Sequence, residues 1–252
     1  MTSSSPDSLA PLAPTTELSK ISGKISRYKK TREMANFFFT DHDRNIMGLS
    51  AIAGALAGAA GMAASTARDA ANLREQADYV EMKINGQPAK GWVWFSPFQN
   101  GDEVELIGTQ QEDYFEIVAI ARPKDRVISL YPHCTRGKHA HIKNIIKWWL
   151  YSVTFLLTIL IPATFILFEF ISPSQEKYIF LEAGYLYLSI GFYMFFGAFT
   201  YVYGKKFLIF AQASKNIFKT LGLNNPEKID LPKQTKRKPD DPGAFGVMYF
   251  KY

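Results

Sequence analysis

Two stretches in the C-terminal half of the chain contain no charged residue, namely residues 148–168 and 183–204. They hold 21 and 22 residues, most of them apolar or aromatic. A helix of about 20 such residues crosses the roughly 30 Å hydrocarbon core of a bilayer. The pattern therefore predicts two transmembrane helices. Because the link at residues 172–177 is short, we expect the helices to form an antiparallel hairpin.

A different pattern occupies residues 79–132, where apolar and polar residues alternate over short runs. The first run places Val80, Met82 and Ile84 on one face of a strand, and an Asn-Gly turn follows directly. Four more runs of this kind follow, separated by short turns. About five short strands with tight turns predict a small β-barrel domain.

A third pattern is the Gly/Ala-rich stretch at residues 45–67, which carries no charge over 23 residues. Gly54, Gly58 and Gly61 fall on one side of a helix, and Gly-x-x-x-Gly is a helix-association motif in membranes. The length of the stretch favours a membrane span. The basic residues around it oppose one, since five precede it and three follow it within 20 residues. The sequence leaves both alternatives open.

These patterns predict an α+β integral membrane protein with a small β-barrel between a Gly/Ala-rich helix and a transmembrane hairpin. We expect a disordered N-terminal tail at residues 1–34, a Gly/Ala-rich helical segment at 35–78, the barrel at 79–135, the hairpin at 136–204 and a cytoplasmic region at 205–252. The tail is rich in Ser, Thr and Pro, which is typical of disorder.

The region at 205–252 begins with a predicted amphipathic helix and ends in a basic tail. Phe210, Ile217, Phe218 and Leu221 gather on one side of this helix, with lysines beside them. A basic amphipathic helix of this kind is expected to lie on the surface of a bilayer.

Basic residues cluster at the two outer ends of the predicted hairpin. Four precede the first span within 20 residues and four follow the second, whereas the link holds only Lys177. By the positive-inside rule, the barrel and the C-terminus then lie in the cytoplasm and the link faces outward, across a bacterial inner membrane. We expect a collar of cations at the lipid headgroups, formed by Arg136, Lys138, Lys143, Lys147, Lys205 and Lys206.

Aromatic residues that favour the membrane interface flank the spans. They are Trp148, Trp149, Tyr201 and Tyr203. Inside the second span, Gly184 and Gly191 share one helical face, and small residues let helices approach closely. This face would pack either within the hairpin or between copies of the chain in a homo-oligomer.

Residue types that bind metals gather just before the first span, where His133, Cys134, His139 and His141 lie within nine residues. Their spacing matches no common zinc pattern such as C-x2-C or H-x3-H. We therefore expect no metal and no cofactor. The sequence also contains no P-loop, G-x-S-x-G, H-E-x-x-H or G-x-G-x-x-G motif, so it predicts no enzyme activity.

The net charge of +6 favours an anionic partner, either lipid or nucleic acid. Five aromatic residues of the predicted barrel are candidates for base stacking, namely Trp92, Trp94, Phe95, Tyr114 and Phe115. Their strands lack a dense row of Lys and Arg, and base stacking normally works together with such a row. We therefore expect the lipid bilayer, and no nucleic acid, as the partner.

Two resemblances add to these predictions. The run "GDEVELIGTQQEDYFEIVAIARP" is similar to the oligonucleotide/oligosaccharide-binding (OB) fold and to small barrels carried by some bacterial membrane proteins. Over residues 35–220, the Gly/Ala-rich helix, the run "YFEIVAIARPKDRVISLYPHCTRGKHAHIK" and the aromatic hairpin together resemble a group of small proteobacterial membrane proteins described as type VI secretion effectors. That resemblance implies competition between bacterial cells and carries over no catalytic residue.

Two functions follow as expectations. In the first, the protein is a non-enzymatic toxin that inserts into the inner membrane of a target cell, where the glycine-rich helix and the aromatic hairpin act. In the second, it is a resident inner-membrane protein, either the immunity partner of a cognate effector or a scaffold whose barrel binds another protein.

Overall fold

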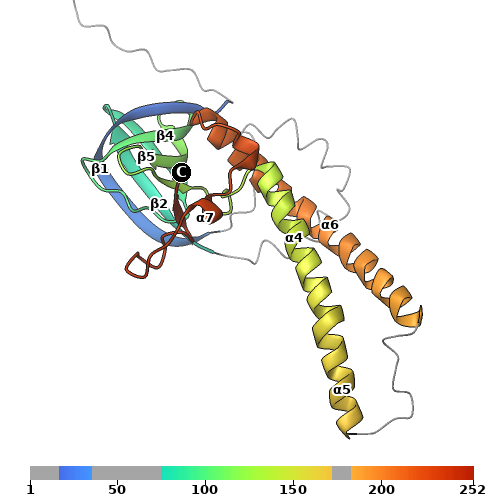
Figure 1. The fold of residues 1–252 in the computed structure, drawn as a ribbon. Coiled ribbons are helices and arrows are strands. Elements are labelled where there is room, and N and C mark those ends of the chain that lie inside the picture. Colours follow the sequence, from blue (N-terminus) through green and yellow to red (C-terminus); the bar gives the residue numbers. More distant parts are fainter. Residues whose placement is uncertain (1–16, 36–74, 172–182) are drawn as a thin grey trace, which may run out of the picture. The chain divides into compact units, whose positions relative to one another are not determined.

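The computed structural model describes residues 17–35, 75–171 and 183–252, which form two compact units. The first unit contains the described residues up to Gly137 together with Phe210–Tyr252, and the second unit is Lys138–Ile209. Strands dominate the first unit, and long helices make up the second (Figure 1). The α+β class predicted from the sequence is confirmed.

Five strands of the first unit close into a barrel. They are β1 (Ser19–Ala35), β2 (Glu75–Ile84), β3 (Gln87–Val93), β4 (Glu103–Gln110) and β5 (Phe115–Arg122). β1 pairs antiparallel with both β2 and β4, β2 pairs with β3, and β4 pairs with β5. A parallel pairing between β3 and β5 closes the ring. The small barrel predicted from the alternating runs is therefore present.

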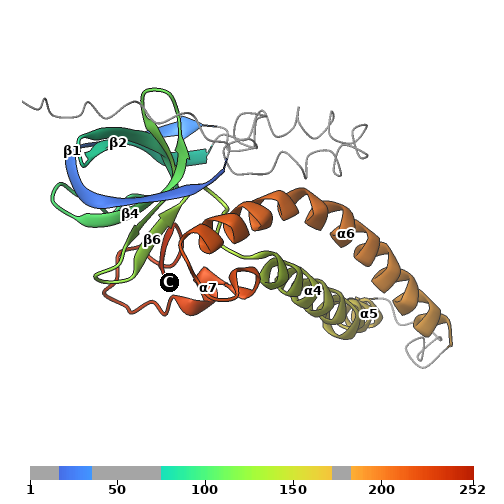
Figure 2. The same ribbon diagram turned by 90° about the horizontal axis from the view of Figure 1, so that it is seen from above.

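The first strand of the barrel corrects the predicted disordered tail, which is wrong for residues 19–34. β1 is a long strand that bends around the barrel, and Figure 2 shows it in blue. Ile25 is the one buried residue of β1, and the other side chains of this strand are exposed or half-buried. A register shift between Ser26 and Lys29 also breaks its alternation, which hides the strand in the sequence. Residues 1–16 lie outside the described residues.

Two further strands extend the sheet beyond β5. β6 (Val127–Leu130) pairs with β5, and β7 (Tyr249–Lys251) pairs with β6. The five runs recognised in the sequence correspond to β2–β6, so the strands predicted are real but only four of them belong to the closed barrel. β2 also begins at Glu75, four residues before the predicted domain boundary, because it continues its pairing with β1 to that point.

Apolar side chains fill the barrel and also cover one outer side of it. The interior contains Val80, Leu106, Phe115 and Ile117. The neighbouring residues of β4 and β6 that point the other way, such as Ile107 and Ile128, are equally buried, so a second apolar layer lies outside the sheet.

The C-terminal part of the chain belongs to the barrel unit, and this corrects the prediction for residues 205–252. α6 (Ala183–Thr220) ends against the barrel in both views (Figures 1 and 2). Its apolar face is buried in protein and does not lie on a bilayer surface. The buried side chains are Phe210, Ile217, Phe218 and Leu221.

The predicted basic tail is also folded, because it forms hydrogen bonds with the barrel unit. A 3-10 turn (Pro226–Lys228), the short helix α7 (Leu231–Gln234) and β7 follow α6. The backbone N–H of Gly137 donates to the carbonyl of Ile229 at 2.9 Å. Hydrogen bonds to the strand region and the pairing with β6 therefore tie this segment to the barrel unit.

The second unit consists of two long helical runs joined through residues 172–182, which lie outside the described residues. The first run contains α4 (Lys138–Phe155), a π-helical turn (Leu156–Leu160) and α5 (Ile161–Ile171), and the second is the first part of α6. Pro162 is the second residue after the π turn, and a proline has no N–H to continue a helical ladder. Two helices of the described residues, Lys138–Leu167 and Gly184–Lys205, are long and apolar enough to cross a membrane.

Candidate functional site

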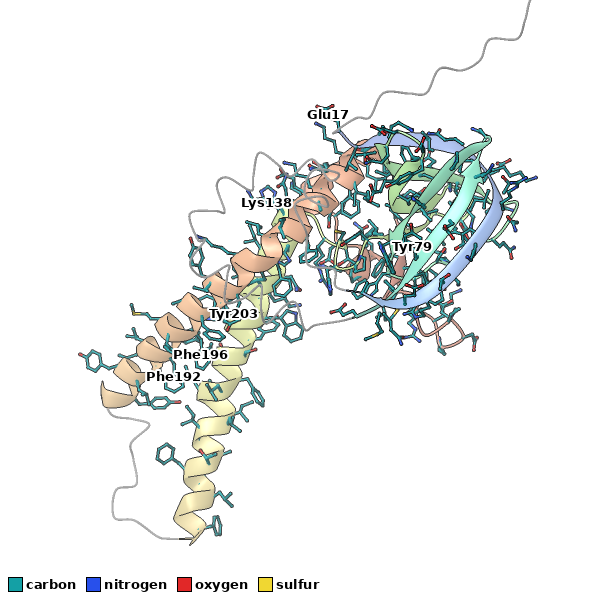
Figure 3. All side chains as sticks on the ribbon, turned by 180° about the vertical axis from the view of Figure 1, so that it is seen from behind. Glu17, Tyr79, Lys138, Phe192, Phe196 and Tyr203 are labelled. Atoms are coloured by element: carbon teal, nitrogen blue, oxygen red, sulfur yellow. The ribbon has the colours of Figure 1, made fainter. Side chains whose placement is uncertain are left out.

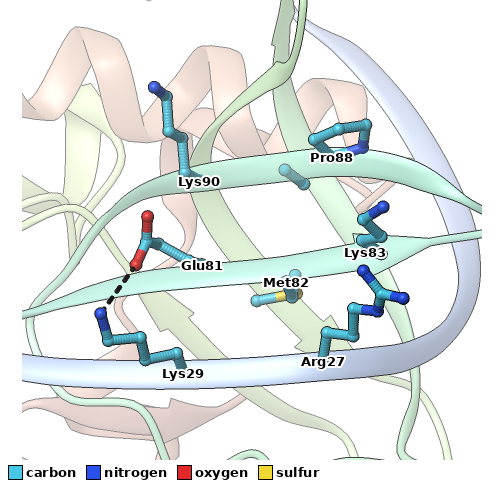
Figure 4. Close-up of a pocket in the computed structure, with 8 residues that line it drawn as sticks. Arg27, Lys29, Glu81, Met82, Lys83, Pro88 and Lys90 are labelled. Atoms are coloured by element: carbon cyan, nitrogen blue, oxygen red, sulfur yellow. Dashed lines mark ion pairs between the residues drawn. The ribbon is translucent and has the colours of Figure 1, made fainter.

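A shallow hollow of about 280 Å³ lies on the outer face of β1, β2 and β3. Four cations and one carboxylate line it: Arg27, Lys29, Lys83, Lys90 and Glu81 (Figure 4). On β2 and β3 these side chains alternate with buried ones, because successive residues of a strand point to opposite faces. The same alternation that fills the barrel interior therefore presents a charged outer face.

The basic character of this face was missed in the sequence. The strands β2 and β3 contribute only Lys83 and Lys90 to it, and the two further cations come from β1. A signal for β1 was present, because Ile21 and Ile25 alternate with polar residues over residues 19–25. The expectation that the barrel lacks a group of basic residues is thus corrected for this face.

A β-bulge fixes the position of Arg27. Its backbone has a φ of 52°, in the left-handed region that residues with a Cβ rarely adopt. The bulge is held by the loop between β3 and β4. The N–H of Tyr28 donates to Asn100 Oδ1 at 2.8 Å, and the N–H of Gly101 donates to the Ile25 carbonyl at 2.9 Å. Bulges re-aim side chains, and here Arg27 faces outward while Tyr28 turns toward the interior.

A buried carboxylate ties the loop after β3 to the first two strands. Asp78 is 1 % exposed and accepts hydrogen bonds from Arg32 Nη1 at 2.8 Å and from the Ser96 N–H at 2.7 Å. Lys30 Nζ lies 3.8 Å from the same carboxylate. The hydroxyl groups of Tyr28 and Ser96 are also hydrogen-bonded to each other, and burial raises the pKa of Tyr28 to about 12. This network stabilises the loop, and the burial of Ser96 keeps its hydroxyl away from any substrate.

The aromatic candidates for base stacking do not form one platform. Trp92 packs against Tyr79 at 5.0 Å between ring centroids, and Tyr114 lies beneath Lys90 Nζ at 3.9 Å. Phe115 fills the barrel interior. The other two are engaged within the fold, since Trp94 contacts His133 and Phe95 stacks on Tyr249.

The four candidate metal ligands are not brought together. His133 Nε2 lies 3.0 Å from a Glu75 carboxylate oxygen, and Cys134 beside it is fully buried. His139 and His141 belong to α4 in the other unit. Among the described residues, no three His, Cys, Asp or Glu side chains are grouped so that they could hold a metal ion.

The glycines of the hairpin divide into two groups. A Cβ added at Gly184 or Gly191 would meet nothing within 4 Å. At Gly197 it would lie 3.2 Å from the Trp149 ring, and at Gly204 it would lie 3.2 Å from Ile145. The helices of the hairpin therefore pack closely at Gly197 and Gly204, and this pair was not predicted from the sequence. Gly54, Gly58 and Gly61 lie outside the described residues.

Polar side chains join the two helical runs of the hairpin. Thr154 Oγ1 and the Tyr193 hydroxyl are 2.7 Å apart. The Tyr185 hydroxyl donates to the carbonyl of Leu157, inside the π turn. In a π turn the regular ladder is interrupted, and these tyrosines supply hydrogen bonds across the helix pair.

The predicted aromatic anchors and cations lie mostly at the surface of the helices. Trp148, Tyr201 and Tyr203 are exposed, whereas Trp149 is half-buried against Gly197. Of the predicted lipid collar, Lys138, Lys143 and Lys147 lie on α4 and Lys205 lies on α6. Lys206 also lies in α6, but its side chain is outside the described part.

One cation of the predicted collar has a protein partner. Arg136 Nε donates to Asp230 Oδ1 at 3.0 Å within the barrel unit. The two residues also form a backbone bridge. Arg136 therefore has a protein partner in the C-terminal segment, and its contact with lipid phosphate stays a prediction.

The chain was compared with protein-family models, with curated proteins and with solved structures, and none of the three comparisons finds a match.

Proposed function

We propose that the chain is an integral membrane protein in which the helical hairpin anchors a non-enzymatic barrel beside the membrane, where the barrel recognises a partner. The observation that carries this proposal is the exposure of large apolar side chains along the hairpin. Phe170 is 86 % exposed, Tyr187 72 % and Met194 71 %. Figure 3 shows side chains standing out along both helical runs, with Phe192, Phe196 and Tyr203 labelled on one of them.

Such exposure is unfavourable in water. Burial of apolar surface away from water lowers the free energy by about 25 cal/mol per Å². Soluble monomers therefore rarely expose large contiguous apolar patches. Within the described hairpin, only Val153 and Leu157 are buried. Hydrocarbon is the solvent that suits such a surface, and both helices have the length to cross it.

The connectivity supports a hairpin with both outer ends on one side of the membrane. The chain leaves the barrel unit after Gly137 and returns to it at Phe210. The Arg136–Asp230 ion pair joins segments from either end of this excursion. Together with the four-one-four distribution of basic residues, this supports a multi-pass protein of a bacterial inner membrane, with the barrel inside and residues 172–177 outside.

The two flanks of the Gly/Ala-rich stretch must also lie on one side of the membrane. Residues 36–74 lie outside the described residues, but Ala35 and Glu75 are register partners in the β1–β2 pairing. The chain therefore enters and leaves this stretch at the same place on the barrel. A single crossing by residues 45–67 would put those two neighbours on opposite sides of the membrane. This supports a protein that is anchored by the hairpin.

Among the two functions expected from the sequence, this favours the resident protein with a partner-binding barrel. The flanks of both apolar regions belong to one folded unit, which would have to stay on one side of a membrane during insertion. The resemblance to type VI secretion effectors keeps the toxin as the alternative. The OB-like interpretation of the barrel is supported by its closure through β3 and β5 and by the charged hollow on β1–β3.

Single-cysteine labelling in cells tests the proposal. Cys134 is fully buried, so it can stay in place. We expect an impermeant maleimide to label Phe170→Cys in intact spheroplasts and Lys124→Cys, in the barrel, only after the cells are opened. The reverse order would overturn the topology. Extraction of the protein by alkaline carbonate would overturn the membrane anchor itself.

Expression in a sensitive host separates the two functions. A resident protein is expected to leave the growth and the membrane potential of the host unchanged. Death or depolarisation of the host on expression of the chain alone would contradict the proposal and favour the toxin.

A further inference from the structure

We propose that the hollow on β1–β3 binds a phosphate-bearing anion, held by Arg27 and Lys83. This inference deepens the proposed function and rests on it only in taking the barrel as the recognition part. The charge balance of the hollow is the first argument. Its single carboxylate, Glu81, lies 3.7 Å from Lys29 and compensates that cation. Among the described residues, no carboxylate forms an ion pair with Arg27, Lys83 or Lys90.

The placement of Arg27 and Lys83 is the second argument. The residue before Arg27, Ser26, is the register partner of Lys83, so the two cations arise from adjacent points of β1 and β2. Figure 4 shows the Arg27 side chain reaching from β1 toward Lys83. Like charges that face each other across two strands destabilise a sheet. A bound anion would remove this repulsion, and without one the arrangement costs stability.

The third argument is the backbone of Arg27. A φ of 52° is unfavourable for a residue with a side chain, and such strain persists where the surroundings impose it. Here the loop at Asn100 and Gly101 imposes it through two hydrogen bonds, one from the Tyr28 N–H to the Asn100 side chain and one from the Gly101 N–H to the Ile25 carbonyl. The result is an arginine that is aimed at the hollow before any ligand arrives, which lowers the entropy lost on binding.

The other rim of the hollow is rigid as well. The Asn85-Gly86 turn between β2 and β3 has positive φ at both residues, of 52° and 86°. Asn85 Nδ2 also donates to the carbonyl of Ser22 on β1 at 2.9 Å. Lys83 and Pro88 flank this turn, so the strand that carries Lys83 has little freedom to move away from Arg27.

These groups select a phosphate among anions. The guanidinium of an arginine is planar and donates two parallel hydrogen bonds to a phosphate, whereas a lysine acts as a mobile point charge. Lys90 stands over the Tyr114 ring at the far side of the hollow and adds a third positive charge. A phosphate group of this kind is offered either by a free phosphorylated molecule or by an anionic lipid headgroup.

Titration of the full chain in phosphatidylcholine nanodiscs with inorganic pyrophosphate tests the site. We expect saturable binding with one site per chain. The double variant Arg27→Ala/Lys83→Ala is expected to bind about tenfold more weakly or worse, since each removed contact is a charge-assisted hydrogen bond. Lys20→Ala/Lys24→Ala is the matched control, because it also removes two positive charges from the barrel, both on β1 and outside the hollow. Amide hydrogen exchange of β1 and β2 checks that both variants are folded.

Three results would overturn the inference. They are the absence of saturable binding, equal weakening in the control variant, and tighter binding of a single-stranded oligonucleotide that depends on Tyr79 and Trp92 more than on Arg27 and Lys83. If the proposed membrane anchor is wrong, the chain will not enter nanodiscs, and this result is distinct from the loss of pyrophosphate binding.

A comparison of nanodiscs with and without phosphatidylglycerol shows whether the phosphate comes from a lipid headgroup or from a free molecule. If a headgroup fills the site, nanodiscs that contain phosphatidylglycerol abolish pyrophosphate binding to the parent chain. If a free phosphorylated molecule fills it, pyrophosphate binds equally in both kinds of nanodisc. Either result supports a phosphate site, and both depend on Arg27 and Lys83.

Discussion

The barrel unit and the hairpin unit distribute the same residue types in opposite ways. In the barrel unit, Phe115, Phe218 and Phe250 are almost completely buried and the cations face outward. In the hairpin unit, Phe170 and Met194 are among the most exposed side chains. The difference teaches that the two units place their apolar side chains differently. Water drives apolar side chains inward in the first unit, and the second exposes an apolar surface, as the proposed membrane anchor requires.

The largest effect that we expect is a loss of stability of the barrel unit when its buried carboxylate, Asp78, is removed. Replacement of Asp78 by Ala removes its hydrogen bonds with Arg32 and with the buried Ser96 N–H and should lower the free energy of unfolding of the barrel by about 3 kcal/mol. Denaturant-dependent hydrogen exchange of β2 and β3 measures it. Glu81→Ala is the control, since its exposed pair with Lys29 contributes about 0–1 kcal/mol. Equal effects of the two substitutions would contradict the structural role of Asp78.

The second prediction tests the solvent of the hairpin. Met194 is 71 % exposed near the middle of the apolar span Gly184–Lys205, and an exposed methionine in water tolerates replacement by arginine. In a bilayer, Met194→Arg should disfavour insertion by about 2.5–3.5 kcal/mol. The fraction of protein retained in membranes after carbonate washing measures this. Gln99→Arg in an exposed loop of the barrel is the control, and equal retention of the two variants would count against the membrane anchor.

The third prediction concerns packing within the hairpin. A side chain at Gly197 would press on the Trp149 ring, so Gly197→Leu should destabilise the helix pair by about 1–3 kcal/mol. Gly191→Leu should leave its stability unchanged, because the added atoms enter open space. Thermal circular dichroism in detergent compares the two. If Gly191→Leu destabilises as strongly, another copy of the chain covers that face, and light scattering would then show an oligomer that the variant loses.

The smallest expected effect is a pH dependence that belongs to the barrel. Burial raises the pKa of Tyr28 from about 10 to about 12, so the folded state keeps this proton where the unfolded state loses it. The stability that the phenol contributes is complete below about pH 10 and disappears as the pH rises through about 12. Difference absorbance between the parent and Tyr28→Phe follows the titration. A midpoint near 10 would show that the Tyr28 phenol is not buried.

Local patterns predicted a large part of the fold. The apolar runs indicated both long helices, and alternation with turn residues indicated β2–β6, because period and length are properties of neighbouring residues. β1 and β7 escaped this reasoning. β1 carries few apolar residues and contains a bulge, and β7 has three residues that are stable only in their pairing with β6.

The candidate site depended on those missed elements. Lys83 and Lys90 could be placed on an outer face from the sequence, but their neighbours Arg27 and Lys29 come from a strand 50 or more residues away. The buried Asp78 likewise shows no local signal, since its partner Arg32 lies on the same distant strand. Long-range pairing decides such sites, and composition does not reveal it.

By itself the sequence determined which segments are apolar enough for a membrane, which alternate, and where the charges concentrate, because these depend only on side-chain chemistry in order along the chain. The tertiary structure alone decided that both flanks of the hairpin return to one folded unit. It also decided that the basic helix end packs on a barrel and that Arg27 meets Lys83. The physical reason is that an amphipathic face buries itself against whatever apolar surface the fold brings to it, and that surface is assembled from residues far apart in the chain.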